Sequence, residues 1–98
     1  MKKKFIVLID TESENQAILF REFLDKKGLG WWHWLSNSWL VADLNGTFTI
    51  KTLMDEVQKA FPNVNCLVTE GGSDGTWVGY GPANEESSNF FPWLKKSW

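Results

Sequence analysis

The chain has 98 residues, the length of one domain with a single modest core. Hydrophobic residues make up 43% and charged residues 22%, which is typical of a folded globular chain and excludes a disordered one. Ten basic residues face twelve acidic residues, so the formal net charge is −2. This balance argues against sequence-independent binding to duplex nucleic acid, which needs many Lys and Arg contacts to phosphate. A short nucleotide or a partner protein remains compatible with it.

Cysteine content and the N-terminal residues indicate the compartment. Cys66 is the single cysteine, so no intrachain disulfide can form and a cytoplasmic location is expected. The apolar run Phe5–Ile9 is too short for a signal peptide, and no segment approaches a membrane span. We therefore expect no membrane partner.

The first half of the chain predicts a strand, a helix and a hairpin. Their expected ranges are Lys4–Asp10, 13–27, Gly30–Leu35 and Ser38–Leu44. The first strand is apolar at every position from Phe5 to Ile9, so it is expected to be buried on both faces. Thr11 or Ser13 offers an N-cap for the helix, and Gly28 suits the position just past its end.

The second half predicts a helix and two further strands. Thr49 is a candidate cap for a helix that ends before Pro62, because apolar residues recur between them at helical spacing. Val64–Thr69 and Thr76–Tyr80 are expected to be strands. The chain closes with an aromatic and basic tail, "FFPWLKKSW".

The order of these elements predicts an α+β fold. Strand-helix-strand-strand-helix-strand favours a ferredoxin-like βαββαβ sandwich over residues 1–98, with a short fifth strand and an aromatic C-terminal tail. The first and third strands would be central, and both helices would cover one face of the sheet. Because these two strands are apolar on both sides, the open face would be an exposed apolar patch, which usually marks an interface. A symmetric homodimer is therefore expected.

Several segments also resemble a known family. A strand ending in Asp10 precedes the hairpin "WWHWLSNSWLVAD", a "CLVTEGG" strand and a "TWVGYG…WLKKSW" ending. The chain resembles the small ferredoxin-fold proteins described as SinR-like, which are similar in fold to the small CRISPR spacer-integration subunit and to VapD-like toxins. The resemblance implies a dimeric domain of CRISPR-associated-like fold, as in the CRISPR subunit and VapD-like relatives, and for SinR-like members themselves it implies little established activity.

The same resemblance identifies a metal-ligand candidate. In the nuclease members, an Asp at the end of the first strand is the proposed ligand for a metal that assists phosphodiester cleavage, and Asp10 matches that position. Oxygen atoms from Ser36, Asn37 and Ser38 are expected nearby, and such hard ligands suit Mg²⁺. The alternative is that Asp10 caps the helix or ends the strand. The single Arg21 and the small basic surface depart from the nuclease pattern.

Aromatic residues are the strongest departure from average composition, with seven tryptophans in 98 residues. In the hairpin, Trp32 and Trp34 would point to one side of the strand, and Trp31 and His33 to the other. Trp39 is expected in the core. Because both sets cannot face the helices, one set would be core and the other would face the dimer, the solvent or a ligand. A nucleobase could stack on such an aromatic ring without sequence readout. The alternative is that all seven serve packing.

Three functions remain open. The first is a non-catalytic homodimer that binds a nucleotide or short oligonucleotide, without a cofactor, in phage–host defence or counter-defence. The expected ligand-binding residues are Trp31, His33, Trp34, Trp77, Ser36 and Asn37. The second is a Mg²⁺-dependent ribonuclease or deoxyribonuclease that uses Asp10. The third is a protein–protein interaction module.

Overall fold

The structure, a computed structural model, describes residues 2–71 apart from the side chain of Trp34. Its elements, in chain order, are β1 (Lys3–Ile9), α1 (Glu14–Lys26), β2 (Gly30–Leu35), β3 (Ser38–Asp43), α2 (Ile50–Ala60) and β4 (Cys66–Gly71). Every element predicted before Gly71 is present, with bounds that differ by at most two residues. The predicted strand Thr76–Tyr80 and the aromatic tail lie outside the described residues.

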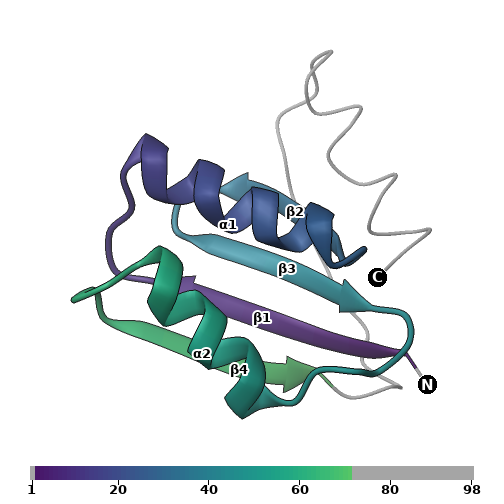
Figure 1. Ribbon diagram of the computed structural model, residues 1–98. Helices are drawn as coiled ribbons and strands as arrows, with labels where there is room; N and C mark the ends of the chain where they lie inside the picture. The colour runs from purple at the N-terminus through teal and green to yellow at the C-terminus, as the bar shows by residue number, and fades with distance from the viewer. Residues whose placement is uncertain (1, 72–98) are drawn as a thin grey trace, which may run out of the picture.

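The six elements form an antiparallel sheet and a layer of two helices (Figure 1). The strand order is β2-β3-β1-β4, so β1 and β3 are the central strands, as expected. Both helices lie on the same face of the sheet in Figure 1. The α+β class is therefore confirmed. Neither α1 nor α2, the helices of the described part, is long and apolar enough to cross a membrane.

Local signals explain where both helices begin. Ser13 caps α1 through a reciprocal capping box: its hydroxyl accepts from the Gln16 backbone N–H, and the Gln16 side chain accepts from the Ser13 backbone N–H. Thr49 and Thr52 make the same arrangement at the start of α2. Gly28 follows α1 with a φ of 71°, a left-handed conformation that glycine adopts without strain. The caps and the glycine thus set the helix ends, as the sequence predicts.

The core lies between the helices and one face of the sheet. Alternate residues of the central strands point into it, and the largest fully buried side chains there include Phe5, Phe20, Trp39 and Phe61. Phe20 of α1 contacts Trp39 edge-on, with the ring centroids 5.0 Å apart. This aromatic contact fixes α1 against β3 and thereby places the site described below.

Within one chain, the helices leave the opposite face of the sheet open. Leu8 of β1 is 40% exposed and Ile6 is half-buried, so a single chain fully buries β1 on one face only, and its burial on both faces stays a prediction tied to the expected homodimer. The physical reason is that two helices cover only one face, and the register pairs Leu8 with Leu67, which is also exposed. Ala42 of β3 is buried on that side, so exposed apolar surface covers only part of the open face.

Candidate functional site

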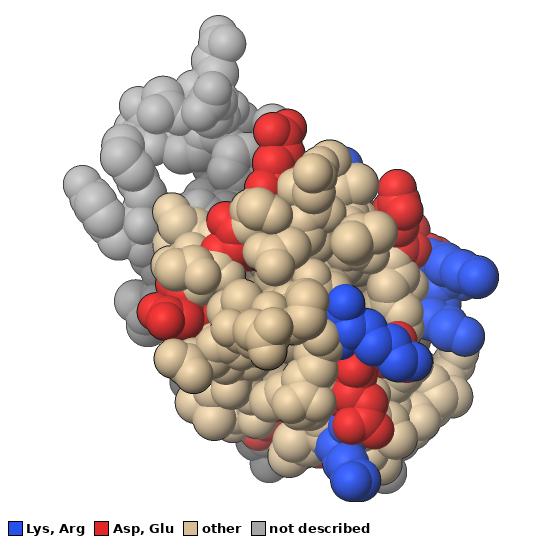
Figure 2. Space-filling view, turned by 60° about the vertical axis from the view of Figure 1, so that its left-hand side comes forward, with Lys and Arg blue, Asp and Glu red and all other residues tan. Residues whose placement is uncertain are grey.

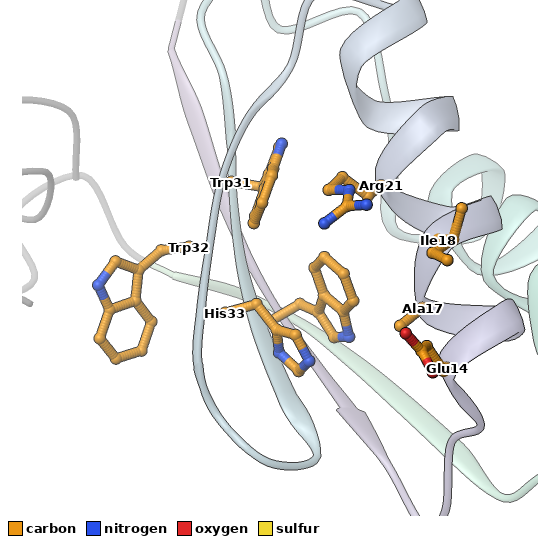
Figure 3. Close-up of a pocket in the computed structure, with 8 residues that line it drawn as sticks. Glu14, Ala17, Ile18, Arg21, Trp31, Trp32 and His33 are labelled. Atoms are coloured by element: carbon orange, nitrogen blue, oxygen red, sulfur yellow. The ribbon is translucent and has the colours of Figure 1, made fainter. Parts of the chain in front are cut away.

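The strand β2 separates its aromatic side chains between the two faces of the sheet (Figure 3). Trp31 and His33 point toward α1, and Trp32 points away from it. Trp32 is buried on its side of the sheet, and Trp39 of β3 is 1% exposed, which confirms its place in the core. The two-sided arrangement of the hairpin is therefore as predicted, and the pair that faces the helix is Trp31 and His33.

A pocket of about 550 Å³ lies between α1 and the β2–β3 hairpin (Figure 3). This volume is in the range of small-molecule sites. The described residues that line it come from α1, β2 and β3, namely Glu14, Ala17, Ile18, Arg21, Trp31, Trp32, His33 and Trp39.

The floor of the pocket is a stacked pair of rings. His33 lies parallel to Trp39, with centroids 3.8 Å apart and planes 6° apart. The Nδ1–H of His33 donates to the Ser38 carbonyl at 2.7 Å, because a carbonyl oxygen can only accept. Its Nε2 lies 2.9 Å from Oε2 of Glu12, and this contact is an ion pair when the ring is protonated. Both ring nitrogens of His33 therefore lie against oxygen atoms of the protein.

Glu12 joins both rings of this floor. Its Oε1 accepts a hydrogen bond of 3.1 Å from the indole N–H of Trp39, while its Oε2 faces His33. Glu12 lies in the short connection between β1 and α1, just before the Ser13 cap. The capped start of the helix thus brings an acidic side chain from residue 12 to a histidine 21 positions later.

The ring of Trp31 is held by a residue near the C-terminal end of α1. The indole N–H of Trp31 donates to Oδ1 of Asp25 at 2.8 Å, and the Trp31 ring lies 5.6 Å from that of Trp39. Trp31 is half-buried, whereas Trp39 is fully covered. Among Trp31, Trp32 and Trp39, the tryptophans whose side chains the structure describes, Trp31 is the one whose hydrogen-bonded ring is partly exposed.

Two charged side chains of α1 complete the pocket. Arg21 points its guanidinium toward Trp31 in Figure 3, and Glu14 stands at the first turn of the helix. Both are exposed, and within residues 2–71 neither forms an ion pair or a side-chain hydrogen bond. The pocket thus offers one cationic donor and one anionic acceptor that are not engaged by the described part of the protein.

The charges on the surface are mixed in sign. On the face in Figure 2, Lys and Arg lie close to Asp and Glu, with a broad uncharged area between the charged groups. A groove that tracks a nucleic-acid backbone needs a run of positive charge. The described residues on this face do not form such a run.

Asp10 and the hairpin turn lie outside the pocket between α1 and the hairpin. The Asn37 amide donates to the Asp10 carbonyl at 3.2 Å, so the expected closeness of the strand end and the turn is found. The Asp10 carboxylate accepts instead from the Asn65 amide at 3.5 Å. Ser36 and Asn37 are exposed in the turn and do not line the aromatic pocket. A second hollow of about 310 Å³ borders Asp10, Asn65 and the strands β1 and β4.

The remaining candidates are placed as follows. Cys66 is partly buried, its thiol donates to the Val64 carbonyl at 3.2 Å, and burial raises its pKa. Among residues 2–71, no three His, Cys, Asp or Glu side chains gather closely enough to hold a metal ion. Trp77 and the loop beyond Gly71 lie outside the described residues, as does the side chain of Trp34.

Sequence reasoning did not select Glu12, Glu14 or Arg21 as site residues. A signal exists for two of them: Glu14 and Arg21 are seven residues apart, which is two helical turns and therefore one side of α1. Which side faces the hairpin is not encoded in that spacing. Glu12 has no local signal, because its partners come from β2 and β3.

Comparison of the chain with protein-family models, with curated proteins and with solved structures finds no match.

Proposed function

We propose that this protein is a non-catalytic binding protein for a nucleotide, which it holds in the pocket between α1 and the β2–β3 hairpin. The observation that carries the proposal is the meeting of the half-buried Trp31 ring and the chain's single arginine, Arg21, at one pocket of about 550 Å³. A flat ring can stack on a nucleobase, and a guanidinium can bind phosphate.

Stacking is supported by the way Trp31 is held. Its N–H is engaged by Asp25, so the ring has one orientation before the ligand arrives. Preorganisation of this kind reduces the entropy lost on binding. Stacking of a base on an aromatic ring is worth about 1–3 kcal/mol, so it has to act together with a phosphate contact to hold a ligand.

Phosphate binding is supported by the chemistry of Arg21. A guanidinium presents its donors in a planar fork that matches two phosphate oxygens, and it stays charged at every physiological pH. The mixed surface charge supports a ligand with few phosphates over a long strand. A mononucleotide therefore fits better than an extended oligonucleotide.

The absence of catalysis is part of the proposal and is supported by the hydrogen bonds of His33. One ring nitrogen is directed at the Ser38 carbonyl and the other at Glu12. A general base needs a nitrogen within reach of the ligand's proton. Because both nitrogens are engaged by the protein, His33 acts in this proposal as a structural support for the pocket floor.

The ferredoxin-like class and the kinship with SinR-like proteins are part of the same proposal. The order β2-β3-β1-β4 with two helices on one face supports the ferredoxin-like class. A role in phage–host conflict rests on the sequence resemblance alone. The nucleotide pocket stands independently of both, since it depends on residues of this chain.

Isothermal titration calorimetry of the full chain with AMP, GMP, CMP and UMP tests the proposal. We expect saturable binding of at least one nucleotide with one site per chain. Arg21→Gln should weaken that binding about 10-fold or more through loss of the phosphate contact. Trp31→Leu should weaken it by about 5-fold to 150-fold through loss of stacking.

Lys59→Gln is the matched control for the arginine variant. Lys59 is an exposed cation on α2 that pairs with Glu56 and does not line the pocket. The Lys59→Gln chain should bind the nucleotide as tightly as the parent chain does. Absence of saturable binding across all four nucleotides, or equal affinity of the parent and Arg21→Gln chains, would overturn the proposed function.

A further inference from the structure

Trp32 is buried on the side of the sheet that neither α1 nor α2 covers. Its side chain points away from α1 in Figure 3, yet the residue is only 5% exposed. Ala42, on the neighbouring strand and the same side, is also buried. Both helices lie on the other face, and the strands of residues 2–71 form one sheet, so none of them stacks on this face (Figure 1).

The neighbours of Trp32 within the sheet do not account for this burial. In the described sheet β2 is an edge strand, so Trp32 has a cross-strand partner on one side only, Leu40 of β3. A neighbour in the sheet covers one edge of an indole and leaves the rest of its large surface open. Because Trp32 is buried in a single chain, the additional cover belongs to the same chain.

The burial is confined to one half of this face. On the same side, Leu8 of β1 is exposed, and so is its partner in the register, Leu67 of β4. The cover therefore lies over β2 and β3, and it leaves the β1–β4 half of the face open.

The chain that follows β4 begins in a suitable position to supply this cover. The register places four residues in one row across the sheet, from the end of β4 to the start of β2: Gly71, Lys4, Ala42 and Gly30. Adjacent strands are about 4.8 Å apart, so this row is about 15 Å long. Residues 72–98 follow Gly71, and at about 3.3 Å per extended residue they are long enough to cross it.

We infer that the C-terminal segment 90–98, "FFPWLKKSW", packs on the β2–β3 half of the open face, over Trp32 and Ala42. The segment is rich in aromatic residues, and aromatic rings pack favourably against one another. The preceding residues 84–89 are polar and suit the crossing from β4. This contact lies on the opposite side of β2 from the candidate pocket, so it does not depend on the proposed function.

Paramagnetic relaxation enhancement in the full chain tests the contact. A nitroxide label is attached at Ser97→Cys in a Cys66→Ser background, which leaves one thiol for the label. We expect the label to remove most of the amide signal of Leu40 and Ala42. The amide of Gln58, an exposed residue of α2 on the other side of the sheet, should keep its intensity.

Lys51→Cys in the same background is the matched control, because it carries the label on α2. It should spare the amides of Leu40 and Ala42. With the label at position 97, a loss at these amides no larger than that at Gln58 would overturn the inference. A mixture of nitroxide-labelled chains with isotope-labelled chains that lack the nitroxide reports contacts between copies. An equal loss in that mixture would overturn the inference too, because the segment would then cover a second copy.

Hydrogen exchange of the indole N–H groups supplies an independent measurement. In a full chain carrying Trp93→Ser and Leu94→Ser, the N–H of Trp32 should exchange at least about 10-fold faster, because exchange requires exposure to solvent. The N–H of Trp31, which donates to Asp25 on the helix side, should keep its rate. An unchanged rate at Trp32, or equal acceleration at both indoles, would overturn the inference.

Discussion

His33 and Trp39 form a parallel stack with centroids 3.8 Å apart, and this pair is the floor of the candidate site. Glu12 accepts from the indole N–H of Trp39 and faces Nε2 of His33. The carboxylate therefore holds together two rings from adjacent strands and connects both to the start of α1.

The first prediction concerns this carboxylate. Glu12→Ala removes the acceptor of the Trp39 N–H, and a polar group left without a partner away from water costs about 1–3 kcal/mol. We expect a loss of that size in the free energy of unfolding, measured by urea denaturation. Glu12→Gln keeps one acceptor oxygen and should lose less stability.

The control is Glu56→Ala, which breaks the exposed pair with Lys59 and should cost at most about 1 kcal/mol. Equal losses for Glu12→Ala and Glu56→Ala would contradict the structural role of Glu12.

The second prediction concerns Asp43, a carboxylate that is only 2% exposed at the end of β3. Its Oδ2 accepts from the Phe48 backbone N–H at 2.8 Å, and its Oδ1 accepts from Gly46 N–H at 3.1 Å. Asp43→Ala leaves the Phe48 N–H without its acceptor, so unfolding should become easier by about 1–3 kcal/mol. Asp55→Ala, at an exposed position of α2, serves as the control and should change stability by less than about 0.5 kcal/mol. A loss no larger than that of the control would show that the β3–α2 turn does not depend on Asp43.

The third prediction concerns the ionisation of Cys66. Burial raises the pKa of this thiol above its ordinary value of 9.0, because desolvation disfavours the thiolate. The unfolded chain therefore loses the proton at lower pH than the folded chain. The stability linked to Cys66 is fully present below pH 9.0 and falls as the pH rises through the higher pKa of the folded state.

Unfolding of the parent and Cys66→Ser chains at a series of alkaline pH values checks this sign. The stability difference between the two chains should be constant below pH 9.0 and should shift against the parent above it. Iodoacetamide, which reacts with the thiolate, should label the folded chain more slowly than the denatured chain at pH 9.0. Labelling at equal rates would show that the thiol is not desolvated in the folded protein.

The fourth prediction concerns the expected homodimer. Leu8 and Leu67 are adjacent in the register of β1 and β4, and Leu67 is 58% exposed on the face opposite the helices. If copies of the chain associate through this face, light scattering at micromolar concentration should give the mass of two chains, and Leu67→Glu should give the mass of one. Leu19→Glu is matched in exposure, at 55%, but lies on α1 and should leave the dimer intact. A single-chain mass for the parent protein would refute the dimer.

Local signals in the sequence were enough to place the elements. The caps at Ser13 and Thr49, the glycine after α1 and the apolar strand patterns act within a few residues, so they are readable along the chain. The same signals predicted that β2 divides its aromatic residues between two faces. They also predicted a strand β1 buried on both sides. Within one chain the helices cover only one side, and Leu8 on the other side is exposed, so burial there depends on the expected homodimer.

The site depended on tertiary structure. Trp31 and His33 were candidates from the sequence, but Ser36 and Asn37 lie in the turn beside Asp10, away from the pocket. Glu12 meets His33 across 21 residues and Trp39 across 27, and no local rule encodes those distances. The sequence by itself thus determined which segments form helices and strands, since caps and periodicity are local. Only the packing of α1 across β2 and β3 decided which side chains share the pocket, because the angle and register of that packing arise from contacts such as Phe20 with Trp39.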